Sequence, residues 1–141
     1  MNIIVSSCLA GCDCKYNGGN NLSKKVSALM DKHTVVCVCP EVLGNLPTPR
    51  PPAEIKDGRV INNLGIDVTE NFKCGAALAL AEAKKYNCTA AVLKANSPSC
   101  GFGKIYDGSF SKTLKDGNGI FAQMLNDNNI KVYTEEDEFD F

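Results

Sequence analysis

The sequence has few of the features that mark membrane, secreted or nucleic-acid-binding proteins. No apolar run is long enough to span a bilayer, and no charged leader followed by a long apolar stretch indicates a signal peptide. The net charge is −1, and the 15 Lys and Arg residues form no basic stripe of the kind that nucleic-acid binding usually needs. We therefore expect a single cytoplasmic domain over residues 1–141 that acts on a small molecule, with no membrane and no stable nucleic-acid complex.

Motifs for nucleotide binding and for a hydrolase triad are also missing. The chain has neither a G-x-G-x-x-G sequence nor a Walker spacing, so a nucleotide site has little support. The only histidine, His33, follows a predicted helix, where we expect it to be solvated. A Ser-His-Asp triad is therefore a poor interpretation of this sequence.

Cysteine, by contrast, is abundant, with eight residues in a chain of 141. Cysteines in a reducing cytosol do not form structural disulfides, which leaves metal ligation, catalysis or burial as their roles. Cys37 lies within an apolar run, Cys74 within a helical pattern and Cys88 just before another apolar run. We expect these three to be small hydrophobic residues of the structure.

Short apolar runs alternate with helical patterns along the chain. The runs are typical of buried parallel strands and cover 2–6, 34–39, 89–94 and 130–133. The helical patterns cover 23–31, 69–85 and 119–125, with Ser23 and Thr69 as expected N-caps. This alternation predicts an α/β fold, a three-layer sandwich around a mostly parallel, Rossmann-like sheet.

Other segments are expected to lie outside that sheet. Asp57-Gly58 separates two short strand-like segments and predicts a small β-hairpin insertion. The proline-rich stretch 44–52 is stiff and could form a fixed wall beside a site. Residues 104–118 are expected to be irregular, and the acidic segment 135–138 to be solvated and frayed.

Three cysteines follow three of the predicted strands. Cys8 comes just after the first strand, Cys39 ends the second, and Cys100 lies a few residues beyond the third. Ligands of parallel sheets bind at the carboxyl ends of the strands, so we expect these sulfurs to meet at one edge. Three thiolates suit a metal or an iron–sulfur cluster and leave one coordination position open for chemistry.

Two loops beside these cysteines carry polar groups. Pro40 turns the chain after Cys39, so Glu41 is expected at the same strand end. There a carboxylate could position water or relay a proton, or it could be an ordinary surface residue. The loop 96–101 holds Ser97 and other polar groups beside Cys100, which indicates either a ligand-binding loop or a capped turn with a buried thiol.

These motifs resemble the thiouracil desulfidase family over nearly the whole chain. In order, they are Ser7-Cys8-Leu9-Ala10-Gly11, Cys39-Pro40-Glu41, Leu46-Pro47-Thr48-Pro49-Arg50-Pro51-Pro52-Ala53-Glu54 and Ser97-Pro98-Ser99-Cys100-Gly101. The resemblance implies a 4Fe–4S cluster held by Cys8, Cys39 and Cys100, with Glu41 and Ser97 as catalytic residues. It also implies desulfuration of a thiolated uracil to uracil and sulfide. Our hypothesis for the mechanism is non-redox, with the cluster acting as a Lewis acid.

Two other functions are compatible with the cysteine pattern. One is a zinc-binding or metal-sensing module with a closed site made by Cys8, Cys12, Cys14 and Cys39. The other is a sulfur-relay protein that carries a persulfide on one nucleophilic cysteine and needs no iron. Metal analysis of anaerobically prepared protein separates both from a cluster-dependent desulfidase.

Overall fold

A computed structural model describes residues 1–139 and 141, and its centre is a four-stranded parallel sheet. The strand order is β2-β1-β5-β8, and every neighbouring pair is parallel. The strands are β1 (Asn2–Ser6), β2 (Thr34–Val38), β5 (Ala90–Leu93) and β8 (Lys131–Thr134). The predicted α/β architecture is confirmed, and the carboxyl ends of β1, β2 and β5 are neighbours because these strands are adjacent in the sheet.

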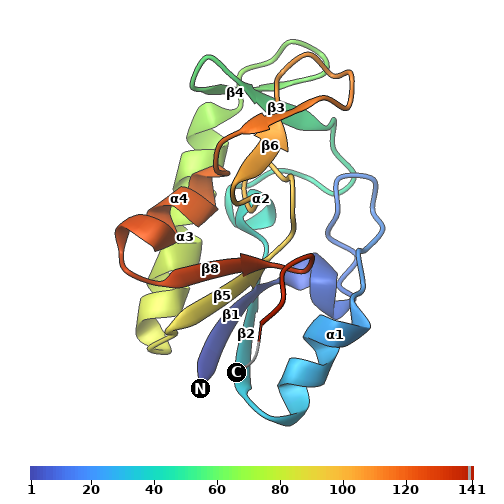
Figure 1. Cartoon of the computed structure of the whole chain (residues 1–141). Coiled ribbons are helices and arrows are strands. Elements are labelled where there is room, and N and C mark those ends of the chain that lie inside the picture. Colours follow the sequence, from blue (N-terminus) through green and yellow to red (C-terminus); the bar gives the residue numbers. More distant parts are fainter. Residues whose placement is uncertain (140) are drawn as a thin grey trace.

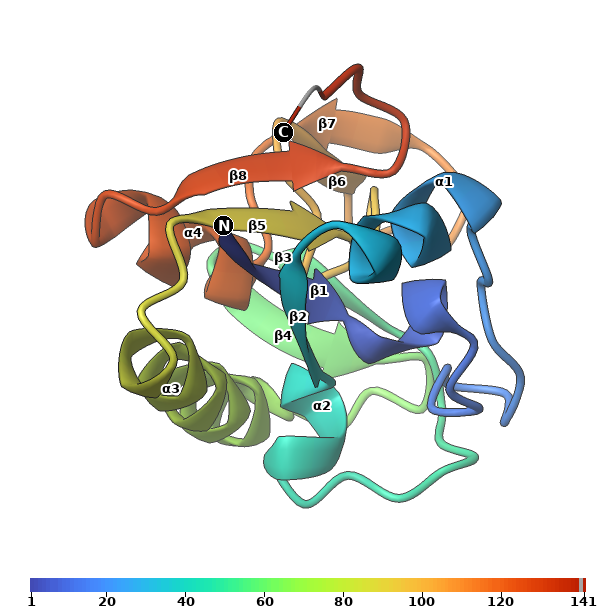
Figure 2. The same cartoon turned by 90° about the horizontal axis from the view of Figure 1, so that it is seen from below.

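Helices cover both faces of the sheet, as Figure 1 shows. The long helix α3 (Thr69–Lys85) and α4 (Ile120–Asp127) pack on one face. The short α1 (Lys24–Ser27) and the 3-10 turns η1 (Ser7–Ala10) and η2 (Ala28–Asp31) cover the other face. Figure 2 shows the same layers from below, with α3 and α1 on opposite sides of the strands.

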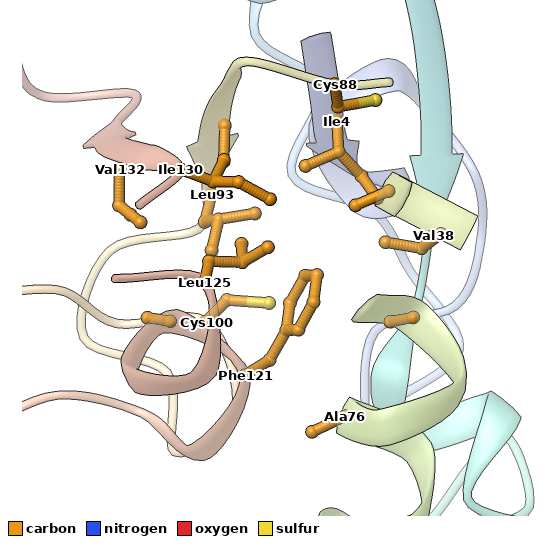
Figure 3. Packing of buried hydrophobic residues seen from close by; sticks show 14 residues of the cluster. Ile4, Val38, Ala76, Cys88, Leu93, Cys100, Phe121, Leu125, Ile130 and Val132 are labelled. Carbon is orange, nitrogen blue, oxygen red and sulfur yellow. The ribbon is translucent and has the colours of Figure 1, made fainter. Parts of the chain in front are cut away.

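The two cores follow from the alternation of side chains along each strand. Ile4 faces α3 and α4, whereas its neighbours Ile3 and Val5 face α1. On the first face, α3 presents Ala76, Ala79 and Ala83, which are fully buried. Figure 3 shows Ile4, Ala76 and Phe121 in this cluster. Small side chains let α3 lie close to the sheet.

Two antiparallel hairpins lie above the sheet in Figure 1, away from both marked termini. The first pairs β3 (Ala53–Lys56) with β4 (Arg59–Asn62), which confirms the predicted insertion. The second pairs β6 (Lys104–Tyr106) with β7 (Leu114–Asp116), where we expected irregular chain. Its strands are short and are joined by the long loop 107–113, so no two-residue turn signals the pairing in the sequence.

One helix was not predicted, and another starts at a different residue from the one expected. Pro40 ends β2 as expected, but it also occupies the first turn of a short helix, α2 (Pro40–Leu43), for which Cys39 is the N-cap. Thr69 is not an N-cap, because it lies inside the first turn of α3. Its Oγ1 accepts the backbone N–H of Val60 at 2.8 Å, which ties α3 to the hairpin.

Several predicted exposures are wrong because they depend on tertiary position. Cys37 is exposed, since β2 is an edge strand, and Cys74 is exposed on the outer side of α3. Cys88 is buried, as predicted. Instead of being frayed, Glu135 accepts the N–H of Ala95 at 2.7 Å and pairs with Lys94.

The chain end also covers the face of the sheet that α1 leaves open. Phe139 and Phe141 stack on each other and pack beside Tyr133. His33, predicted to be solvated, is half-buried against Phe141, with its Nε2 3.3 Å from the Phe141 carbonyl oxygen. Among the described residues, no helix has the length and apolar character needed to cross a membrane.

We predict that Gly75→Ala lowers the free energy of unfolding by about 3 kcal/mol, because overpacking at a close backbone contact forces both helices to move. A Cβ at Gly75 would lie 1.7 Å from the Pro40 carbonyl oxygen of α2. Urea unfolding of the full chain measures the change. Leu78→Ala is the control on the same helix, since Leu78 is exposed. A wild-type midpoint for Gly75→Ala would contradict the close packing of α2 on α3.

Candidate functional site

One cavity of about 490 Å³ lies where β1, β2 and β5 end. Cys8 reaches it from η1, directly after β1, and Cys39 from the residue that follows β2. Cys100 reaches it from the loop that follows β5, and Glu41 and Ser97 line the same cavity. The structure thus brings together all five residues that the sequence singled out, while their roles stay predictions.

Burial favours the neutral thiol form of Cys8 and Cys100 in this cavity. Burial raises the pKa of the Cys100 thiol to about 12. Burial also raises the pKa of Cys8, and a hydrogen bond from Asn21 to its sulfur opposes this effect. Thiolate ligation therefore needs a positively charged group that replaces the protons, and an iron–sulfur cluster is such a group.

A fourth thiol, that of Cys14, also lines the cavity. Burial raises its pKa to about 12, and the nearby Cys39 contributes to the shift. Its backbone carbonyl oxygen accepts a hydrogen bond from Arg50 at 2.8 Å, which fixes this part of the first loop. Cys12 is exposed and does not line the cavity.

Three thiols on one cavity are a donor set that suits an iron–sulfur cluster. Within the described residues, no group of three or more His, Cys, Asp or Glu side chains is placed to hold one metal ion. A tetrahedral zinc site would need four ligands at about 2–2.3 Å from one point. Cys8, Cys39 and Cys100 instead border a shared space of about 490 Å³. The closed zinc site with Cys12 is not formed by these residues.

Glu41 is held in place from two sides. Its Oε1 accepts the Nε–H of Arg50 at 3.0 Å, and its Oε2 accepts the hydroxyl of Ser99 at 2.9 Å. The Arg50 side chain is 5% exposed and that of Glu41 is 17% exposed, so water competes little for this pair. Arg50 also donates to the oxygens of Pro47 and Thr48 in the proline-rich segment. Glu41 is therefore a fixed carboxylate on the cavity wall and not a free surface residue.

Ser97 sits in a tight turn that leads to Cys100. Its Oγ accepts the backbone N–H groups of Ser99 and Cys100, each at 3.1 Å. The turn closes through the N–H of Gly101, which donates to the Ser97 carbonyl oxygen at 2.8 Å. A Cβ at Gly101 would lie 2.7 Å from that oxygen, so this turn requires glycine.

Sequence reasoning gave no role to several other residues of the site. Arg50 and Ser99 lie in the noted motifs, but their contacts with Glu41, over 9 and 58 positions of the chain, form only in the folded structure. Further side chains line the cavity, namely Lys15, Tyr16, Lys94, Tyr106, Phe110 and Lys112. Lys94 directly follows β5, whereas the position of the others depends on how the first loop and the β6–β7 hairpin fold over the sheet edge, which no local pattern signals.

A family model, a curated relative and a solved structure each match nearly the whole chain. Residues 3–137 match the family model described as 2-thiouracil desulfurase. The chain is 43% identical to the uncharacterized protein YbbK of Bacillus subtilis, with 96% of each chain covered. A solved structure described as the 4Fe–4S-dependent thiouracil desulfidase TudS superposes with a TM-score of 0.89 at 41% identity, covering 96% of this chain and 91% of that one.

Proposed function

Since the chain belongs to the 2-thiouracil desulfurase family, we propose that it removes sulfur from a thiolated uracil with a 4Fe–4S cluster held by Cys8, Cys39 and Cys100. The overall reaction consumes one water and converts a ring C=S group into C=O, with release of hydrogen sulfide. Atoms and electrons balance without an oxidant or a reductant. The reaction is thus a hydrolytic carbon–sulfur cleavage.

One observation supports this proposal most strongly: the thiols of Cys8, Cys39 and Cys100 share a single cavity with Glu41 and Ser97. Three protein thiolates leave one iron of a cluster without a protein ligand. When bound, the cluster supplies a Lewis-acidic iron with affinity for the sulfur of the substrate. Side chains of the protein carry out the remaining steps of the reaction.

Glu41 is the proposed general base. Its carboxylate, fixed by Arg50 and Ser99, takes a proton from the water that attacks the ring carbon bearing the sulfur. Ser97 is proposed to turn its hydroxyl hydrogen from Ser99 to the tetrahedral intermediate on that carbon and to donate a hydrogen bond to it. Because Ser97 accepts two backbone N–H groups, its oxygen is held at a defined place on the wall.

The proposed setting is the cytoplasm, with a small thiolated nucleobase as the partner. A reducing compartment would keep the eight cysteines of the chain available as thiols. The aromatic side chains of Tyr106 and Phe110 on the cavity wall suit a planar ring. We expect no stable complex with nucleic acid, since the chain carries a net charge of −1.

Anaerobic reconstitution tests the proposed function directly. The full chain is loaded with iron and sulfide, iron is counted per chain, and 2-thiouracil is then added. We expect stoichiometric formation of uracil and sulfide. A loaded, folded protein that leaves 2-thiouracil unchanged would refute this substrate, and a colourless protein with one zinc per chain would favour the zinc-binding module. A labile sulfur detected by mass on iron-free protein would favour the sulfur relay.

We predict that Cys12→Ser and Cys14→Ser each keep the iron content of the wild type, whereas Cys39→Ser loses it. Cys14 lines the cavity beside Cys39, so this pair tests which of two neighbouring thiols is a ligand. Iron and acid-labile sulfide per chain, together with the visible absorption spectrum, are the measurements. Loss of iron in Cys14→Ser with retention in Cys39→Ser would reverse the assignment.

A further inference from the structure

The two proposed catalytic side chains, Glu41 and Ser97, are connected through a third residue, Ser99. Glu41 comes from α2, after β2, and Ser97 from the loop after β5. The Oγ of Ser99 lies 2.9 Å from Glu41 Oε2 and 3.0 Å from Ser97 Oγ. Ser99 is 2% exposed, so water does not replace these contacts.

The direction of the hydrogens in this network follows from the capacity of each group. A carboxylate only accepts, so the single hydroxyl hydrogen of Ser99 points to Glu41. The Ser99 oxygen must then accept from Ser97. Ser97 can only donate to Ser99, because its two lone pairs already accept the N–H groups of Ser99 and Cys100.

A competing acceptor for the Ser99 hydrogen is the sulfur of Cys100, at 3.6 Å. The Glu41 carboxylate lies closer, at 2.9 Å, and a charged oxygen is a stronger acceptor than a thiol. The hydrogen bonds therefore run from Ser97 to Ser99 to Glu41. Arg50 completes this network by donating to the other carboxylate oxygen.

We propose that Ser99 is a positioning residue that joins Ser97 and Glu41 into one hydrogen-bonded unit. This inference rests on the proposed function for its catalytic meaning. Without Ser99, Glu41 Oε2 loses its hydroxyl donor and the carboxylate is held by Arg50 alone. The Ser97 hydroxyl loses its resting-state acceptor at the same time, so neither group is held at a defined place before the substrate reacts.

The kinetic test compares Ser99→Ala and Ser99→Thr in the cluster-loaded enzyme. We expect Ser99→Ala to keep the wild-type iron content and a KM within about twofold, while kcat falls about 10- to 100-fold, the size expected for lost orientation. Ser99→Thr, which keeps a hydroxyl, should recover most of kcat. Wild-type kcat in Ser99→Ala would overturn the proposal, and so would a fall in rate that matches a fall in iron, because Ser99 would then merely support Cys100.

Thr69→Val is the matched control for the loss of a buried hydroxyl. Thr69 is fully buried, and its Oγ1 accepts the N–H of Val60 outside the cavity. We expect this variant to lower the urea midpoint while its kcat stays at the wild-type value. A similar loss of kcat in Thr69→Val would show that the effect of Ser99→Ala is a general consequence of destabilisation, which also overturns the proposal.

A double-variant comparison in the full chain tests the link without any substrate. Ser99→Ala should lower the urea midpoint in the wild type, but much less in Glu41→Ala, because the two variants remove the same hydrogen bond. Ser99→Ala combined with Thr69→Val should be additive. Additive effects for Ser99 and Glu41 would refute the link even if 2-thiouracil proved to be the wrong substrate, so failure of the proposed function and failure of this inference are separate results.

Discussion

Cys100→Ala is expected to lose the iron–sulfur cluster and all measurable desulfurase activity together. Cys100 is 4% exposed and lines the cavity from the loop that follows β5. No other thiol of that loop could replace it. Thiolate ligation is coupled to cluster binding, so one missing thiolate leaves two protein ligands where three are needed. Iron per chain and uracil formation after anaerobic reconstitution are the measurements.

Cys88→Ala is the matched control for this prediction. Cys88 and Cys100 are both buried and belong to the same hydrophobic cluster, in which both are labelled in Figure 3. The two substitutions thus remove the same atoms from the same core and have similar packing costs. Cys88 does not line the cavity, so this variant should keep its iron and its activity. Normal iron in Cys100→Ala, or loss of iron in Cys88→Ala, would contradict the ligand assignment.

The convergence of the three cysteines could be predicted because it depends on strand order only weakly. Residues 2–6, 34–39 and 89–94 read as buried strands, and in a parallel sheet every carboxyl end lies on one edge. Cys8, Cys39 and Cys100 follow those strands closely, so any adjacent arrangement brings them together. The apolar pattern alone therefore predicts the edge of the sheet at which the site lies.

The support of the site could not be predicted in the same way. The hydrogen bond from Ser99 to Glu41 spans 58 positions of the chain, and it exists only because β2 and β5 flank β1. The prediction of side-chain exposure failed for a related reason. Cys37 reads as a core residue within its run, but it belongs to an edge strand, and strand order is not encoded locally.

Short elements were missed where tertiary contacts stabilise them. The helix α2 has only one turn, and it forms where Pro40 and the N-cap Cys39 start it and where α3 packs against it through Gly75. The β6–β7 hairpin has three residues in each strand, and its loop is held by Glu54, which accepts the N–H groups of Gly108 and Phe110. Neither element has enough local pattern to be predicted.

Glu41→Gln is expected to lower kcat by about 10²- to 10⁴-fold, the usual contribution of a general base. The side chain keeps its size, and its carbonyl oxygen can still accept a hydrogen bond from Arg50, so the wall of the cavity should stay in place. The amide cannot accept the proton of the attacking water. Iron content and KM should therefore remain close to the wild-type values, and single-turnover conversion of 2-thiouracil measures the loss.

Glu54→Gln separates this chemical effect from the general effect of removing a buried carboxylate from the cavity. Glu54 is 9% exposed and lines the same cavity, but its Oε1 accepts backbone N–H groups of the β6–β7 loop. Its replacement should cost far less activity than that of Glu41, because the amide oxygen can still accept these bonds. Equal losses in the two variants would indicate that the negative charge of the cavity matters and not a proton transfer at Glu41. Full activity of iron-loaded Glu41→Gln would show that Glu41 is not the general base. The link from Ser97 through Ser99 to Glu41 would then have no role in catalysis.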